Sequence, residues 1–228
     1  MNVIEVKDLK KVYNESEVKV TALNGIDLTI AEGEFTAIVG PSGSGKTTFL
    51  NMLGGLDSPT EGQVTIGGTG ISRLSSSQLI SFRLHNIGFV FQAYNLIPVL
   101  TARENVEFIM QLQGVGRKER EARATELLSR VGLGERINSR PSRLSGGQQQ
   151  RVAVARALAS KPQFVLADEP TANLDSVSTE NLLNIMEELN REEQITFVFS
   201  THDQRVVHKA RRVITLEDGK IISDVRKS

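Results

Sequence analysis

The stretch that decides the fold is residues 35–48, which read FTAIVGPSGSGKTT. The apolar segment 35–39 predicts a buried strand, and the residues after Lys46 predict a helix. The glycines between them let the backbone wrap with its N–H groups inward, and the helix N-terminus adds partial positive charge. A glycine-rich turn between a strand and a helix is typical of a phosphate-binding loop. The residues expected to bind phosphate are Gly40, Pro41, Ser42, Gly43, Ser44, Gly45, Lys46, Thr47 and Thr48.

Two side chains of this loop have predicted roles in binding a nucleotide. The Lys46 ammonium would reach the β- and γ-phosphates, and the Thr47 hydroxyl would ligate Mg²⁺. The plain alternative is a flexible Gly/Ser loop before a helix. The strand before the loop and the helix after it favour the phosphate-binding interpretation.

A pair of acids follows a second apolar segment, residues 164–167. Such a segment delivers a carboxylate to the carboxyl edge of a parallel sheet, where ligands bind. Asp168 would hold Mg²⁺, and Glu169 would act as the general base that polarises the attacking water. Taken alone, the pair could equally be a strand followed by a solvated acidic turn. Its place after a phosphate loop favours the catalytic interpretation.

A second candidate anion site lies at residues 144–148, LSGGQ, directly before a predicted helix. Ser145 is a good N-cap, and Gly146 and Gly147 leave the N–H groups beside Gln148 unobstructed at a positive helix end. Because one nucleotide has only one triphosphate, this second site is expected to face the ATP of another subunit. The alternative is a glycine-containing helix start with no functional meaning.

Composition and charge narrow the class of protein. The chain has 228 residues, 27 basic and 27 acidic side chains, and no cysteine. A balanced charge argues against a nucleic-acid partner, because phosphate neutralisation needs an excess of Lys and Arg. The longest segment without charged residues, 84–102, contains polar side chains and a proline, so it is not expected to span a bilayer. The N-terminus lacks the apolar segment of a signal peptide, so we expect a cytoplasmic protein.

The remaining pattern predicts an α/β protein. Short apolar segments predict strands in the first ninety residues, helical spacing dominates from 101 to 160, and strands alternate with helices after that. Thr101 and Glu104 form a predicted capping box, and Asp218 and Gly219 a predicted hairpin turn. We expect a core of residues 1–92 and 161–228, a helical insertion at about 93–160, and a loose tail at 224–228.

In order and spacing, these motifs resemble those of the ATP-binding cassette ATPases over essentially the whole chain. The resemblance rests on the loop 40–47, Gln92, the segment 144–148, Asp168 with Glu169, Asp175 and His202. It implies a P-loop NTPase core with a mixed sheet, an antiparallel β subdomain and an inserted helical subdomain. It also implies an ATPase that uses ATP and Mg²⁺.

The resemblance assigns roles to further residues. It implies that Tyr13 stacks on adenine, that Gln92 senses Mg²⁺ and the attacking water, that Asp175 communicates across a dimer, and that His202 contacts the γ-phosphate. From the sequence alone, Tyr13 could be a packing aromatic and Gln92 an ordinary polar loop residue. The other histidines, His85 and His208, are expected to be surface or capping residues.

The resemblance also implies partners. It suggests a homodimer of ATPase subunits on the cytoplasmic face of the inner membrane, docked to a membrane permease near residues 92–100. Segment 94–100 is apolar enough for docking, although it could instead cover the joint between two subdomains. Segments 53–62, 87–92 and 170–175 look most like the branch that serves lipoprotein release, macrolide efflux and antimicrobial-peptide resistance. A soluble cassette ATPase with a non-transport partner and a P-loop kinase are the alternatives.

Overall fold

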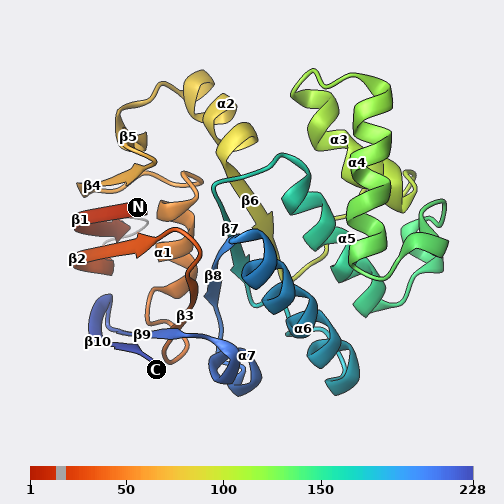
Figure 1. The fold of residues 1–228 in the computed structure, drawn as a ribbon. Helices are drawn as coiled ribbons and strands as arrows, with labels where there is room; N and C mark the ends of the chain where they lie inside the picture. Colours follow the sequence, from red (N-terminus) through yellow and green to blue (C-terminus); the bar gives the residue numbers. More distant parts are fainter. Residues whose placement is uncertain (14–18, 228) are drawn as a thin grey trace.

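A computed structural model describes residues 1–13 and 19–227, arranged around two β-sheets (Figure 1). The larger sheet has the strand order β10-β9-β3-β8-β7-β6, and the smaller has the order β2-β1-β4-β5. The strands are β1 (Asn2–Tyr13), β2 (Val20–Ala31), β3 (Phe35–Val39), β4 (Glu61–Ile66), β5 (Thr69–Gly70), β6 (Ile87–Val90), β7 (Phe164–Asp168), β8 (Thr196–Ser200), β9 (Arg212–Glu217) and β10 (Lys220–Arg226). The helices are α1 (Lys46–Leu53), α2 (Ser76–Asn86), α3 (Ala102–Leu112), α4 (Arg117–Arg130), α5 (Gly146–Ala159), α6 (Ser176–Glu193) and α7 (Gln204–Lys209).

The larger sheet is mixed. Strands β9, β3, β8, β7 and β6 pair in parallel, and only the edge strand β10 is antiparallel to its neighbour. The inner strands β3, β7 and β8 are almost fully buried, as expected for parallel strands covered on both faces. Their carboxyl ends lead into the segments that contain Gly40, Asp168 and His202, so the topology gathers the predicted chemistry at one edge.

The smaller sheet is antiparallel and covers helix α1. In β2 the buried residues Ile26, Leu28 and Ile30 alternate with exposed ones, the pattern of a strand with one face on the core. These residues share a hydrophobic cluster with Phe49 of α1 and Ile38 of the larger sheet. The cluster fixes α1, and therefore the loop before it, between the two sheets. The predicted fold class, an α/β core with an antiparallel β part and inserted helices, is confirmed.

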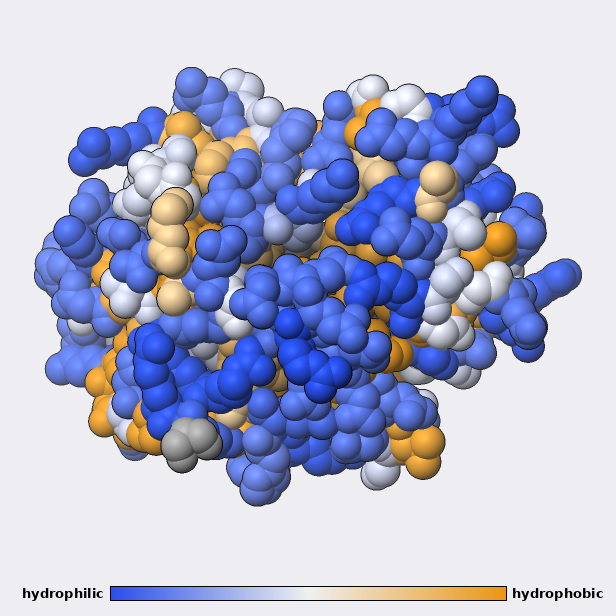
Figure 2. Space-filling model, viewed as in Figure 1, coloured by the Kyte–Doolittle hydropathy of each residue, from blue (hydrophilic) through white to orange (hydrophobic). Residues whose placement is uncertain are grey.

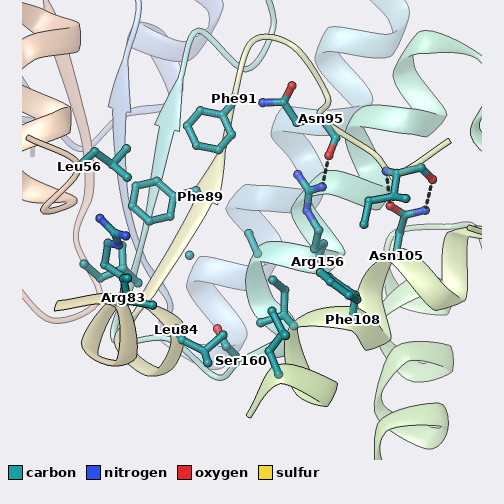
Figure 3. Close-up of a pocket in the computed structure, with 17 residues that line it drawn as sticks. Leu56, Arg83, Leu84, Phe89, Phe91, Asn95, Asn105, Phe108, Arg156 and Ser160 are labelled. Atoms are coloured by element: carbon teal, nitrogen blue, oxygen red, sulfur yellow. Dashed lines mark hydrogen bonds between the residues drawn. The ribbon is translucent and has the colours of Figure 1, made fainter. Parts of the chain in front are cut away.

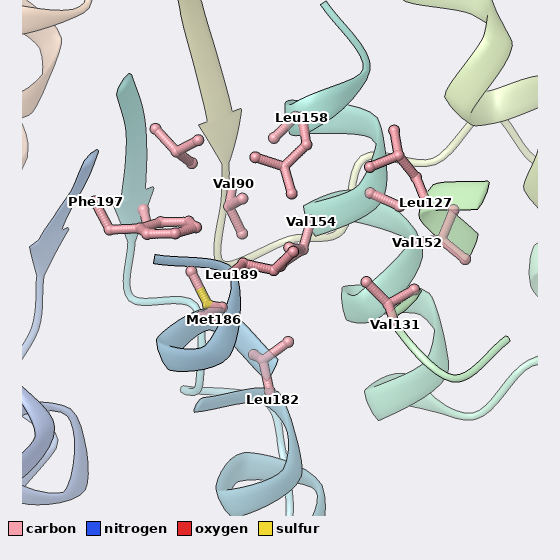
Figure 4. Close-up of a cluster of buried hydrophobic side chains, with 14 of the residues drawn as sticks. Val90, Leu127, Val131, Val152, Val154, Leu158, Leu182, Met186, Leu189 and Phe197 are labelled. Atoms are coloured by element: carbon pink, nitrogen blue, oxygen red, sulfur yellow. The ribbon is translucent and has the colours of Figure 1, made fainter. Parts of the chain in front are cut away.

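Helices α3, α4 and α5 lie to one side of the larger sheet (Figure 1). The predicted capping box at Thr101 is present, since its side chain accepts from the Glu104 N–H and the Glu104 carboxylate accepts from the Thr101 N–H. Helix α5 joins the larger sheet to the helices α3 and α4, because Val154 points to the sheet and Val152 points to α4 (Figure 4). One hydrophobic cluster therefore runs from the sheet to α4, and the division at 93–160 stays a prediction.

The expectation of a loose tail at 224–228 is wrong for the part of it that the structure describes. Strand β10 continues to Arg226, and Asp224 accepts two hydrogen bonds from the buried Arg212 guanidinium, at 2.8 and 2.7 Å. Arg212 also pairs with Glu34 at 2.9 Å, so the tail is tied to the start of β3. The turn before β10 is as predicted, with Asp218 and Gly219 both at positive φ.

The surface in the view of Figure 2 is mostly hydrophilic, with apolar residues in small groups. Within residues 1–13 and 19–227, no helix has the length and hydropathy that crossing a membrane requires.

Candidate functional site

The predicted phosphate loop forms a tight turn between β3 and α1. Gly45, the residue before α1, has φ of 99°, and a Cβ atom there would lie 2.4 Å from the carbonyl oxygen of Ala22. Only glycine fits, because both the backbone conformation and the space exclude a side chain. No side chain in the described part of the chain caps α1, so the first N–H groups of this helix remain available to an anion. Lys46 Nζ donates to the carbonyl oxygens of Gly40 and Pro41, both at 2.9 Å, which holds the ammonium over the loop.

The two acids at the carboxyl end of β7, Asp168 in the strand and Glu169 directly after it, have different surroundings. Asp168 Oδ1 accepts a long hydrogen bond of 3.4 Å from Thr47 Oγ1, which places a carboxylate and a hydroxyl oxygen together beside the loop. Burial raises the pKa of the Asp168 carboxyl, and the negative charge of neighbouring Glu169 acts in the same direction. A cation would relieve both effects. Carboxylate and hydroxyl oxygens are suitable ligands for Mg²⁺, so these residues fit that ion.

Glu169 is held by the segment that follows β8. Its Oε1 lies 2.7 Å from His202 Nδ1, and its Oε2 accepts from Thr201 Oγ1 at 3.2 Å. The backbone of Glu169 is left-handed, with φ of 45°, and its N–H donates to the Ser200 carbonyl. A non-glycine residue in this conformation is strained, so the contacts from 200–202 are what keep the carboxylate in place.

A second hydrogen bond between the segments 169–171 and 201–203 was not predicted. Thr171 is buried, and its Oγ1 donates to Asp203 Oδ2 at 2.9 Å. Asp203 is in turn held by the Arg205 guanidinium at 2.8–3.2 Å. A threonine two residues after an acidic pair gives no recognisable signal, because the contact joins positions that are 32 residues apart.

These elements surround one cavity of about 690 Å³. Gln92, Glu169 and His202 line it together with most of the predicted phosphate loop, and Thr47 connects it to Asp168. Ser44 is buried and does not line it. Residues 20–22 and Ala172 also line the cavity and were not predicted. Nothing in residues 20–22 indicates a ligand, because it is their position on the neighbouring sheet that brings them there.

Tyr13 lies outside the residues that line this cavity. Its hydroxyl donates to Asp57 Oδ2 at 2.9 Å, and Lys11 Nζ lies 4.7 Å from the centre of its ring. It pairs across the β1–β2 hairpin with Val20, which does line the cavity. Tyr13 therefore lies at the end of the β1–β2 pair that is next to the cavity. Its stacking on adenine stays a prediction.

The predicted second anion site is also outside the cavity. Ser145 Oγ accepts from the Gln148 N–H at 3.3 Å, and Gln148 Oε1 accepts from the Ser145 N–H at 2.9 Å, which completes a capping box on α5. A Cβ atom on Gly147 would lie 2.7 Å from Ser178 Oγ, and one on Gly146 would lie 2.6 Å from the Tyr94 hydroxyl. The glycines allow this close packing.

Asp175 lies beside this serine-glycine turn. It caps α6, because its Oδ1 accepts from the Ser178 N–H at 2.9 Å and its Oδ2 from Ser178 Oγ at 2.6 Å. These hydrogen bonds lower the pKa of the Asp175 carboxyl. Asn173, which was not predicted, donates to the Gln92 carbonyl at 3.1 Å and accepts from the Tyr94 hydroxyl at 3.4 Å. The segment 169–175 thus links the cavity to the serine-glycine turn.

The apolar segment 94–100 lines a second cavity and is also tied down. Asn105 bonds both the N–H and the carbonyl of Ile97. The Arg156 guanidinium donates to the carbonyl of Asn95 (Figure 3) and also to that of Tyr94. Leu96 packs on the core, whereas Val99 is 70% exposed. Segment 94–100 therefore covers the joint between the sheet and the helices α3–α5. It also borders a cavity of about 650 Å³, the groove between α2, β6 and α3 (Figure 3).

Known proteins are similar to this chain in sequence. A family profile described as ABC transporter matches residues 23–172. The lipoprotein-releasing system ATP-binding protein LolD of Geobacter metallireducens is 46% identical over 223 residues, 98% of this chain and 99% of LolD. The macrolide export ATP-binding/permease protein MacB of Hyphomonas neptunium is 50% identical over 221 residues, 97% of this chain and 34% of MacB. The chain thus spans about a third of the length of that MacB.

A solved structure also superposes closely. The ATP-binding cassette MJ0796, in a dimeric post-hydrolysis state bound to ADP and Pi, has a TM-score of 0.90 and 44% identity, covering 99% of both chains. The predicted branch, which includes lipoprotein release and macrolide efflux, is confirmed by the relatives LolD and MacB. The chain belongs to the ABC transporter family, and it is an ATP-hydrolysing cassette.

Proposed function

We propose that two copies of this chain close around two ATP molecules and open after hydrolysis. Each ATP would bind to the phosphate loop of one copy and to Ser145, Gly146, Gly147 and Gln148 of the other. The observation that carries this proposal is that the serine-glycine turn does not line the phosphate-loop cavity of its own chain. The dimeric structure of MJ0796 supports it by similarity.

Within that site each residue has a separate task. The loop N–H groups and Lys46 would bind the phosphates, in place of the carbonyl contacts that Lys46 now makes. Glu169 would accept a proton from the attacking water, and His202 and Thr201 would orient its carboxylate. Thr47, Asp168 and Gln92 would hold Mg²⁺, which would neutralise charge on the phosphates when bound. Asp175 would lie close to the partner copy, and Tyr13 would face adenine.

The opening and closing would drive a membrane permease on the cytoplasmic side of the inner membrane. Segment 92–100 and the groove beside it are the proposed docking site, because apolar side chains remain exposed there. The proposed substrate is a lipoprotein, a peptide or a drug, exported or extracted at the bacterial envelope. The names of LolD and MacB support the lipoprotein and, as a macrolide, the drug.

The substitution Glu169→Gln tests the dimer directly. It keeps the shape of the site and removes the base, so ATP should stay bound and hold two chains together. Gel filtration with ATP should give a dimer, while the double variant Lys46→Ala, Glu169→Gln should stay monomeric. If Glu169→Gln remains monomeric at micromolar concentration with saturating ATP, the shared site is wrong. Co-purification with membranes separates a transport partner from a soluble one.

A further inference from the structure

One buried side chain joins the two segments that contain Gln92 and Glu169. Gln150 lies on α5 and is completely buried. Its Nε2 donates to the carbonyl of Pro170 at 2.8 Å and to the carbonyl of Phe91 at 3.2 Å. Pro170 directly follows Glu169, and Phe91 directly precedes Gln92. A single amide group therefore spans two loops that border the phosphate-loop cavity, although Gln150 does not itself line that cavity.

The orientation of this amide is fixed by its neighbours. Carbonyl oxygens accept hydrogen bonds and cannot donate them, so the NH₂ half of the Gln150 amide must face both. The other half, Oε1, is buried and has no hydrogen-bond partner among the described residues. A buried acceptor without a partner is unfavourable. Gln150 thus binds the two carbonyl groups while its own oxygen stays unsatisfied.

The backbone of Gln92 is held at both of its peptide groups. The carbonyl of Phe91, in the peptide group before it, accepts from Gln150. The carbonyl of Gln92, in the peptide group after it, accepts from Asn173 at 3.1 Å. Strand β6 ends at Val90, so no strand ladder holds these two carbonyls. The two amide side chains therefore set the backbone from which the Gln92 side chain extends.

Glu169 is held from more than one side. Residues 200–202, at the end of β8 and after it, bond its N–H and its carboxylate. From the side of α5, Gln150 binds the Pro170 carbonyl. The proline ring restricts the backbone between this carbonyl and Glu169, so a movement of the carbonyl is passed on to Glu169. Because the left-handed backbone of Glu169 is strained, loss of this contact should let its carboxylate move.

We propose that Gln150 is a positioning residue for ATP hydrolysis, which keeps Gln92 and Glu169 in fixed relative positions. This inference rests on the roles proposed above for Gln92 at Mg²⁺ and for Glu169 as the base. Gln150 acts through these residues and not on the nucleotide. It lies on the helix that begins at the serine-glycine turn, so an ATP bound there by the partner copy would act on the chain's own Gln92 and Glu169 through this side chain.

The substitution Gln150→Met tests this role. Methionine has nearly the same size as glutamine but cannot donate a hydrogen bond, so both carbonyls lose their partner. We expect kcat to fall about tenfold, because the two loops are no longer fixed relative to each other. The Kd of a fluorescent ATP analogue should stay within about twofold, because ATP binding is proposed to depend on the phosphate loop. A purely structural role would not separate kcat from Kd in this way.

Asn190→Leu is a control that is matched in burial and in chemistry. Asn190 on α6 is also completely buried, and its Nδ2 donates to the carbonyls of Gly33 and Ile195 at 3.0 and 2.6 Å. These carbonyls lie just before β3 and β8, at the edge of the larger sheet opposite to the cavity. Asn190→Leu should therefore lower the melting temperature, as Gln150→Met does, and leave kcat unchanged.

A shorter amide keeps the test valid if Gln150→Met does not fold. Gln150→Asn retains the NH₂ group but lacks one methylene, so it cannot reach both carbonyls, and kcat should fall about threefold. A second measurement uses the double variant Gln150→Met, Glu169→Gln. It should still form the ATP-bound dimer in gel filtration, because Gln150 is proposed to position the groups for hydrolysis and not to bind ATP.

Three results would overturn the proposal. An unchanged kcat in Gln150→Met would show that the two hydrogen bonds do not position the loops. A loss of ATP affinity as large as the loss of kcat would show a structural effect on the whole cassette. An equal fall of kcat in Asn190→Leu would show a general effect of destabilisation. If Glu169→Gln alone stays monomeric with ATP, the shared site is wrong, while the kcat and Kd of Gln150→Met still decide the role of this glutamine.

Discussion

Two glycine-rich turns begin helices in this protein, and they are built in opposite ways. At the start of α1, Gly45 leaves the helix N-terminus without a side-chain cap, and the cavity lies in front of it. At the start of α5, Ser145 and Gln148 cap the helix reciprocally. The same reciprocal box occurs at Ser75 on α2 and Thr101 on α3. The first turn is therefore prepared for an anion within one chain, while the second has the local structure of an ordinary N-cap.

This comparison shows why a sequence motif and a local structure can give different information. The phosphate loop could be identified from either, because its conformation already excludes a side chain. The turn at 145–148 looks functional only in its sequence, since its hydrogen bonds in a single chain are those of a cap. The proposed function of the turn at 145–148 depends on a second copy of the chain. Its tests therefore need a comparison with a cap that has no proposed partner, such as the one at Ser75.

The largest effect is expected at the first turn. Gly45→Ala would bring a Cβ atom to 2.4 Å from the Ala22 carbonyl at a φ of 99°. The loop must shift to relieve the contact, and a misplaced loop should weaken ATP binding by about 100-fold. Titration with a fluorescent ATP analogue measures this. Gly68→Ala is the control. Its φ is +81°, but no atom of the described residues lies within 4 Å of the added Cβ, so the variant should cost about 1 kcal/mol of stability and keep ATP binding.

The second effect compares two serines in the same cap. Ser145→Ala and Ser75→Ala each remove one capping bond and should each lower the free energy of unfolding by about 1 kcal/mol. Only Ser145 is proposed to contact the ATP of a partner. The variant Ser145→Ala should therefore also lose about tenfold in ATPase activity or ATP-driven dimerisation. Equal activity of the two variants would mean that the serine is a cap and nothing more.

A smaller effect on activity is expected in the segment 169–175, which links the phosphate-loop cavity to the serine-glycine turn at 145–148. Thr171→Val removes the bond to Asp203 and loosens the contact between residues 169–171 and 201–203. We expect ATP hydrolysis to fall about fivefold with ATP affinity unchanged, because the lost bond helps to position Glu169. Thr179→Val is a matched control. It is also buried, but its hydroxyl has no hydrogen-bond partner in the described residues, so activity should stay the same.

Much of this arrangement could be predicted from the sequence. The phosphate loop, the acids at the end of β7 and His202 could be predicted from apolar segments that end in polar residues, because parallel strands bring such ends to one edge of the sheet. The hydrogen bonds from Thr171 to Asp203 and from Asn173 to Gln92 could not be predicted, because their partners are 32 and 81 residues apart in the sequence. The tail was misjudged for the same reason. The charged residues Asp224, Arg226 and Lys227 look solvated in the sequence, and only the fold brings Asp224 to the buried Arg212.

The smallest effect concerns the acids at the two ends of the segment 168–175, whose pKa values shift in opposite directions. The pKa of Asp168 is raised from its ordinary 3.8, so the folded chain binds this proton more tightly than the unfolded chain does. Its charge therefore reduces stability as the pH rises through the raised pKa. Without nucleotide, Asp168→Asn should raise the melting temperature at pH 7 by about 2 °C, although it removes a proposed Mg²⁺ ligand.

Asp175 should behave in the opposite way. Its pKa is lowered from 3.8 by the hydrogen bonds of the cap, so its charge adds stability above 3.8, and this stability is lost as the pH falls through the lowered value. Asp175→Asn should lower the melting temperature at pH 7, only slightly because asparagine is also a good N-cap. In thermal melts of the nucleotide-free protein, the Asp168 difference should shrink as the pH falls from the raised pKa toward 3.8, whereas the Asp175 difference should shrink only as the pH falls below 3.8 toward the lowered pKa. Shifts of the same sign at pH 7 would show that these two carboxylates do not differ as their contacts indicate.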